Sequence, residues 1–133
     1  TATLANLKRG IGGTVDIEFC VQMLQLRYGL EFPDVLQPGT LNAISSLEEA
    51  KLLTSEDAES LRSGYRLLRS VESRLRLLNT TARHDLPEKD GELDKLAYIL
   101  RSDDVASLQR ELASSRRENR RVFQATVARL VAE

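Results

Sequence analysis

The approach to the first predicted helix holds the residues best suited to bind an anion. Lys8 and Arg9 supply two cations, and Gly10, Gly12 and Gly13 follow them directly before the helix. Free backbone amides at a helix N-terminus, the helix dipole and nearby cations can together hold a phosphate. The alternative is a flexible linker with two solvated charges, because a pair of glycines before a helix is a weak signal.

Polar residues interrupt the apolar surface of this first helix, which we predict over residues 15–28 with Thr14 as its cap. At 100° per residue, Glu18, Gln22 and Gln25 fall within about 60° of one another. Such a stripe is costly to bury without polar partners. Either it forms a hydrogen-bond network with arginines of the long helix predicted at about residues 56–79, or it faces a ligand or another domain.

Asp16 requires a separate interpretation, because residues two positions apart do not share a helix face. Asp16 and Glu18 therefore cannot be assumed to bind one metal ion. In the first turn, Asp16 interacts favourably with the helix dipole. A role close to a metal or nucleotide requires a second domain that brings the ligand to it.

The last helix carries a dense cluster of basic residues. It consists of Arg116, Arg117, Arg120 and Arg121, partly offset by Glu118. No aromatic residues interleave it to stack on bases, so nucleic-acid binding is a poor interpretation. We predict instead that residues 114–121 meet solvent or dock on an acidic protein surface.

Several chemistries are excluded because their residues are missing. The chain has one histidine, His84, and one cysteine, Cys20, and it has no P-loop, zinc-ligand set or nucleophile elbow. We therefore predict no catalytic residue and no metal site in this chain. A net charge of -1 and only short apolar runs favour a cytoplasmic protein that binds neither nucleic acid nor membrane.

The elements that position these residues are predicted to be helices. Strong helix formers fill the chain between three prolines and seven glycines, which indicates an all-α fold, an antiparallel helical bundle of about five helices. Apolar spacing places the helices at about 15–28, 40–52, 56–79, 92–101 and 105–132. Their predicted caps are Thr40, Thr54 or Ser55, and the pair Asp103 and Asp104. The first helix, apolar around most of its circumference, is expected to be enclosed by the others. On the long third helix, Arg69 and Glu72 are spaced to pair.

Residues 12–19 read GGTVDIEF, and the pattern continues with Val21-Gln22 and with LQLRYG at residues 24–29. Residues 65–75 (YRLLRSVESRL) and 84–87 (HDLP) follow in the same order of elements. This sequence resembles glutamine synthetase adenylyltransferase, also called the adenylyl-removing enzyme, in the helical segment that follows each nucleotidyltransferase domain. The resemblance extends from Leu7 to about Phe123. The PII uridylyltransferase family has a related helical domain.

The resemblance implies a full-length enzyme that uses magnesium and ATP to move AMP to or from a tyrosine of glutamine synthetase, with the PII signal protein as a further partner. The Gly-Ser element and spaced acidic residues of its catalytic domain do not occur here, so this chain alone is expected to be inactive. Residues 1–13 are then a linker from an upstream nucleotidyltransferase domain, and residues 14–133 are a single helical bundle domain.

In this interpretation the first helix packs against the catalytic cleft. The residues placed nearest to nucleotide or metal are Lys8, Arg9, Gly10, Gly12, Gly13, Asp16, Glu18 and Gln22. Of the two halves of such an enzyme, the sequence around Asp16 looks closer to the half that attaches AMP. The alternative function is a non-catalytic interaction module that docks through its arginine-rich last helix.

Overall fold

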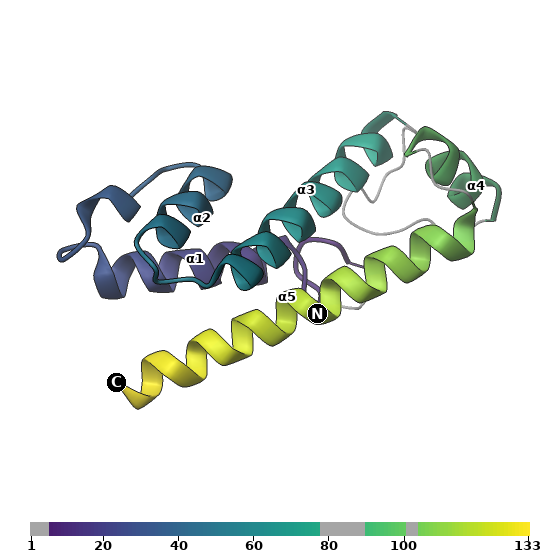
Figure 1. The fold of residues 1–133 in the computed structure, drawn as a ribbon. Coiled ribbons are helices and arrows are strands. Elements are labelled where there is room, and N and C mark those ends of the chain that lie inside the picture. Colours follow the sequence, from purple (N-terminus) through teal and green to yellow (C-terminus); the bar gives the residue numbers. More distant parts are fainter. Residues whose placement is uncertain (1–5, 78–89, 101–103) are drawn as a thin grey trace.

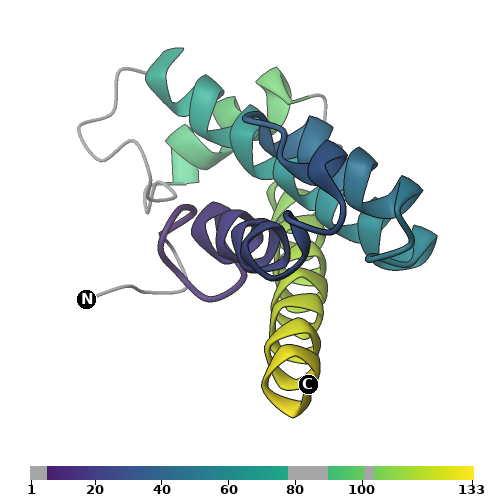
Figure 2. The ribbon, with the colours of Figure 1, turned by 90° about the vertical axis from the view of Figure 1, so that its left-hand side faces the viewer.

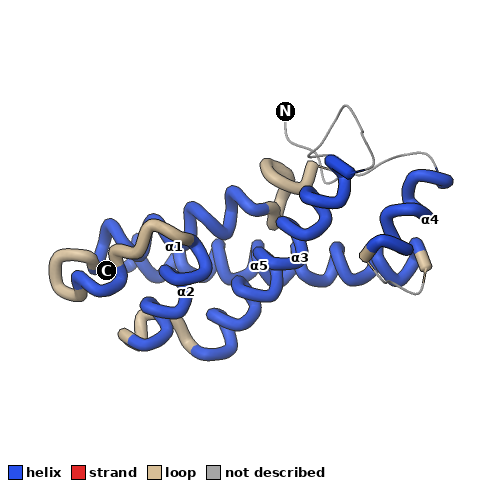
Figure 3. Tube along the Cα trace, turned by 90° about the horizontal axis from the view of Figure 1, so that it is seen from above, coloured by secondary structure: helices blue, strands red, loops and turns tan. Residues whose placement is uncertain are grey.

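A computed structural model describes residues 6–77, 90–100 and 104–133. Its elements are α1 (Thr14–Tyr28), the short 3₁₀ helix η1 (Pro33–Val35), α2 (Thr40–Glu49), α3 (Ser55–Leu77), α4 (Asp90–Ile99) and α5 (Val105–Ala132). Figure 3 shows only helices and loops in this part of the chain. The predicted all-α bundle of five helices is confirmed. His84 lies outside the described residues.

Helix α5 extends along the whole bundle, and both α3 and α1 pack against it (Figure 1). Helix α2 and η1 cover α1 at one end, and α4 contacts both α3 and α5 at the other. Helices α3 and α5 run in opposite directions, as in an antiparallel bundle.

Helices α1 and α5 run in the same direction instead, and Figure 2 shows this pair from one end of the molecule. Their contacts follow the same order along both helices: the loop residue Gly12 with Asn119, Asp16 with Arg120, Cys20 with Thr126, and Tyr28 with Glu133.

Apolar residues at helical spacing form a stripe along α3, and this stripe is the centre of the core. Leu61, Leu68, Val71 and Leu75 are fully buried, at the helical spacing that the sequence shows. Their partners come from each neighbouring helix: Ile17 and Leu24 of α1, Ile44 and Leu47 of α2, Leu96 of α4, and Leu108 and Val122 of α5. The predicted pair on α3 is also confirmed: Arg69, whose side chain is exposed, places Nη1 at 3.6 Å from Oε2 of the buried Glu72.

Two of the predicted helix caps are confirmed and two are wrong. Thr54 Oγ1 accepts from the Asp57 amide at 3.1 Å, and Asp104 Oδ1 accepts from the Ser107 amide at 2.7 Å. The N-caps of α1 and α2 are instead Gly13 and Gly39, which make no side-chain bond. Thr14 and Thr40 each lie one residue inside their helix, where a hydroxyl cannot reach the first free amides.

The crossing of α3 and α5 depends on the absence of a side chain at Gly64. A Cβ atom at this position would collide with the amide group of Asn119, which is buried on α5. Asn119 cannot move away, because its Nδ2 donates to the Gly12 carbonyl at 2.9 Å. The close approach therefore fixes the two helices and the loop before α1 at one point.

We predict that Gly64→Ala lowers the free energy of unfolding by about 1–3 kcal/mol, because overpacking outweighs the gain in helix propensity. Urea unfolding followed by circular dichroism measures the change. Gly39→Ala is the matched control, since a Cβ there meets only Asn42 Nδ2 at 3.8 Å and its cost is limited to the loss of a favourable N-cap residue of α2, at most about 1 kcal/mol. Equal stability of the two variants would contradict the close approach.

Candidate functional site

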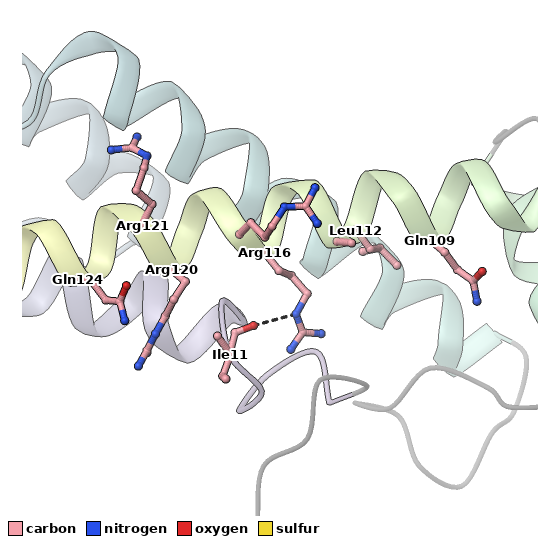
Figure 4. A pocket seen from close by; sticks show the side chains of 9 residues that line it. Ile11, Gln109, Leu112, Arg116, Arg120, Arg121 and Gln124 are labelled. Atoms are coloured by element: carbon pink, nitrogen blue, oxygen red, sulfur yellow. Dashed lines mark hydrogen bonds between the residues drawn. The ribbon is translucent and has the colours of Figure 1, made fainter.

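The middle of α5 binds the loop of residues 6–13 through the loop's backbone carbonyls. Arg116 Nε donates to the Ile11 carbonyl at 3.0 Å (Figure 4), and its Nη2 donates to the Asn6 carbonyl at 2.9 Å. Asn119 adds its bond to the Gly12 carbonyl. Arg116 is only 7% exposed and Asn119 is fully buried. The prediction that this part of α5 meets solvent or a partner is therefore wrong at these two residues, which the chain's own loop covers.

The loop is folded compactly by its own hydrogen bonds. Asn6 Oδ1 accepts from the amides of Lys8 and Arg9, at 3.1 and 2.7 Å, and the side chain of Leu7 is fully buried. Gly12 adopts a φ of +73°, and a Cβ atom there would collide with the backbone of Arg116. Only glycine combines this backbone conformation with so close an approach.

The amides at the start of α1 are not free to bind an anion. Those of Gly13, Thr14 and Val15 donate to the carbonyls of Gly10, Leu7 and Lys8 at 2.9, 3.1 and 2.9 Å. The Gly12 amide donates to Asp16 Oδ2 at 2.7 Å. The expectation that free amides could hold a phosphate here is therefore wrong, because the loop folds back and uses them.

Asp16 connects the loop, α1 and α5. Besides accepting from the Gly12 amide, its Oδ2 atom accepts from Arg120 Nη1 at 3.1 Å. Arg120 in turn lies over the ring of Phe123, with 4.9 Å between its Cζ atom and the ring centre. Within the described chain, Asp16 thus holds the loop in place and is not directed toward an open site.

The four arginines of the basic cluster do not form one continuous surface. Arg116 is bonded to the loop and Arg120 to Asp16, while Arg121 contacts Glu118 and, on α3, Asp57, at 2.8 and 2.9 Å. Arg117 is exposed and forms no ion pair with any described residue. Burial lowers the pKa of Arg116, whereas the hydrogen bonds to Glu118 and Asp57 raise the pKa of Arg121.

One face of α1 remains uncovered, and we call Glu18, Phe19, Gln22 and Leu26 the outer face of α1. Phe19 is 52% exposed and Leu26 is 86% exposed, so the prediction of a fully enclosed helix is wrong here. Glu18 and Gln22 have no hydrogen-bond partner among the described residues, and neither do the side chains of Lys8 and Arg9 near the start of the helix. The predicted network with arginines of α3 is absent from that part of the chain.

The third residue of the predicted polar stripe has a structural role. Gln25 Nε2 donates to the carbonyls of Val35 and Gln37, at 2.8 and 3.0 Å, and so holds the segment around η1 against α1. The sequence stripe therefore divides into one residue that serves the fold and two that point outward. Spacing alone could not separate them, because Gln25 is bonded to backbone groups.

The described residues offer no site for a metal. No group of three or more His, Cys, Asp or Glu side chains among them could hold a metal ion. Cys20 is buried and donates to Thr126 Oγ1 at 3.4 Å, and its burial raises the pKa of the thiol. In the same part of the chain, every helix is too short or too polar to cross a membrane.

Comparison with known proteins gives the family. A family model described as GlnD PII-uridylyltransferase matches residues 2–127, nearly the whole chain. The chain belongs to this family. Three bifunctional glutamine synthetase adenylyltransferase/adenylyl-removing enzymes are also similar to it, so the predicted resemblance to these enzymes is confirmed.

The similarity to these enzymes is limited to a small part of each. The Caulobacter vibrioides protein is 42% identical over 99 residues, which is 74% of this chain and 10% of the relative. The proteins of Agrobacterium fabrum and Streptomyces avermitilis are 35% and 36% identical, each over 107 residues and 11% of its length, covering 80% and 79% of this chain. The chain therefore spans about a tenth of the length of the curated relatives it matches.

We predict that Arg116→Ala destabilises the chain by about 1–3 kcal/mol, because it leaves two carbonyls of the loop without donors. The amides of residues 12–15 should also lose protection from hydrogen exchange. Their hydrogen bonds depend on the folded loop, which Arg116 no longer holds in this variant. Hydrogen exchange followed by NMR measures both effects.

The adjacent variant Arg117→Ala is the control, because Arg117 is exposed and has no ion pair within the described chain. It should change stability by less than about 0.5 kcal/mol. Similar losses of stability and protection in both variants would show that Arg116 does not hold the loop.

Proposed function

We propose that the chain is a helical domain of a bifunctional glutamine synthetase adenylyltransferase/adenylyl-removing enzyme. In this role it packs beside a nucleotidyltransferase domain, completes its cleft and helps to present glutamine synthetase for transfer of AMP. The names of the similar proteins support this function, and the short part of each that the chain matches supports its being one domain among several. The observation that carries the proposal is the outer face of α1.

This face has the composition of a contact between domains. Phe19 and Leu26 expose large apolar side chains, and burial of each would contribute about 1.5–3 kcal/mol. Glu18 and Gln22 lie on the same face and offer hydrogen-bonding groups that no described residue uses. An apolar patch with polar groups beside it is typical of such contacts. We infer that a neighbouring domain covers it.

The described residues do not fit a magnesium site, and their loop amides do not fit a phosphate site. The proposal therefore assigns magnesium and ATP to another part of the full-length protein, in the cytoplasm, and assigns no chemical step to this chain. Lys8 and Arg9 are the cations at the start of α1 that remain available to a bound nucleotide. We retain the half that attaches AMP as the proposed assignment, with the PII signal protein as a partner of the whole enzyme.

The alternative function, docking on an acidic partner through the arginine-rich last helix, has less support. Three of its four arginines are bonded within the chain, to loop carbonyls or to carboxylates. A partner would have to displace these contacts before it could use their charges. Arg117 alone of the four has no such bond among the described residues.

The test replaces Leu26 with Glu in the full-length protein. Transfer of AMP to glutamine synthetase should fall at least about tenfold, because a charge at the interface disfavours the contact by more than about 1.4 kcal/mol. The same substitution in the 133-residue chain should leave its unfolding unchanged, because Leu26 is 86% exposed there.

The control is Tyr98→Glu on α4, which replaces a side chain that is 84% exposed and far from α1 in the fold. Its transfer rate should equal that of the unmodified protein. Full activity of the Leu26→Glu protein would remove the proposed role of this face.

A further inference from the structure

A cavity of 610 Å³ lies on the side of α5 that faces away from α3, next to the loop before α1 (Figure 4). The side chains that matter for its chemistry are Ile11 of the loop and Leu112, Ala113, Arg116, Arg117 and Arg120 of α5. Its volume is within the range of about 300–1,000 Å³ that is usual for small-molecule sites. The cavity is separate from the outer face of α1, so a ligand site here is independent of the proposed function.

The cavity has more positive charge than the described chain neutralises. Arg117 has no carboxylate partner among the described residues, and Arg116 is bonded only to neutral carbonyls. Arg116 Nη1 is buried and has no hydrogen-bond acceptor in the same part of the chain. Apart from the partners of Arg121, Asp16 is the one described carboxylate that contacts a lining arginine, and it is shared with the Gly12 amide. A buried or half-buried cation without a counter-ion favours binding of an anion.

Arg121 does not add to this charge, although it lies at the edge of the cavity. Figure 4 shows its side chain directed away from those of Arg116 and Arg120, and its guanidinium pairs with Asp57 and Glu118. The positive charge therefore lies along Arg116, Arg117 and Arg120.

Apart from the arginines, the wall consists of the aliphatic residues Ile11, Leu112 and Ala113 and the uncharged amide side chains of Gln109 and Gln124. Ile11 is 55% exposed and Ala113 is also exposed, so these two present a hydrocarbon surface beside the arginines, with the buried Leu112 at its base. None of the described side chains that line the cavity is aromatic, so a nucleotide base would find no ring to stack on. The wall thus fits an aliphatic ligand better than a nucleotide.

We propose that this cavity binds a small aliphatic organic anion. Its acidic group bonds to Arg117 and Arg120, within the field of Arg116, and its hydrocarbon part lies against Ile11, Leu112 and Ala113. Guanidinium groups bind carboxylate and phosphate through the same paired geometry, so the shared chemistry is an acidic oxygen group on an aliphatic body.

Isothermal titration calorimetry on the 133-residue chain tests this with four probes. Hexanoate and hexyl phosphate carry both features, hexanol lacks the charge, and acetate lacks the hydrocarbon. We expect hexanoate or hexyl phosphate to bind at least about tenfold more tightly than hexanol and acetate, a difference of about 1.4 kcal/mol. The comparison of hexanoate with hexyl phosphate shows which acidic group is preferred, and preference for either supports the site.

Variants locate the binding. Arg117→Gln should weaken it about tenfold, and Ala113→Trp should abolish it by filling the cavity; both positions are exposed on α5, so the fold should persist. Arg110→Gln is the matched control, because Arg110 is exposed on the same helix, bonds to Ser107 and does not line the cavity. Its affinity should equal that of the unmodified chain.

Three results would overturn the proposal. The first is binding of both acidic probes no tighter than that of hexanol, and the second is affinity that neither Arg117→Gln nor Ala113→Trp changes. The third is binding of an acidic amphipathic peptide with no binding of either small acidic probe, which would show that the face takes a protein segment. Urea unfolding of each variant checks that the variant is still folded, so that a loss of affinity cannot be attributed to unfolding.

Discussion

The arrangement of the whole bundle depends on the hydrogen bonds by which α5 holds the carbonyls of the loop before α1. Arg116 and Asn119 are both buried, and each would be costly to bury without acceptors. The carbonyls of Asn6, Ile11 and Gly12 supply these acceptors, and they in turn would be left without donors if the loop turned elsewhere. Loop and helix therefore satisfy each other at these three bonds, although Arg116 Nη1 and Asn119 Oδ1 have no partner among the described residues. The bonds fix the direction in which α1 leaves the loop.

Two glycines make these bonds geometrically possible. Gly12 brings the loop backbone against the backbone of Arg116, and Gly64 brings α3 against Asn119 from the other side. Side chains at either position would separate the elements and lengthen the hydrogen bonds. Asn119 lies between the two glycines. Its buried side-chain amide therefore contacts both α3 and the loop that leads into α1, and so sets the positions of α1 and α3 relative to α5. The apolar core packs around the Asn119 side chain, so the stability of the core depends on these contacts.

Sequence patterns predicted best where periodicity decides the structure, as in the stripe of α3 and the position of α5. Prediction failed where backbone groups are the partners: Arg116, Asn119 and Gln25 interrupt an apolar pattern just as solvated residues do, although carbonyls cover them. It failed again at Phe19 and Leu26, which are open in the described fold. A sequence pattern reflects burial in the complete protein, whereas the described residues supply neighbours for only part of α1. This excess of apolar residues over available neighbours is the physical argument for a further contact at the outer face.

Arg120 links the loop before α1 to the cavity on α5. It pairs with Asp16, which lies on α1 and also holds the Gly12 amide, and it lines the cavity with its remaining donors. An anion that bonded to Arg120 in the proposed site would share this guanidinium with Asp16, and so with the carboxylate that holds the Gly12 amide. By linkage, any weakening of the Asp16 pair by the anion would be matched by an equal effect of that pair on the affinity for the anion. The outer face of α1 is formed by other residues of the helix, so this linkage concerns the loop before α1 and not the proposed contact between domains.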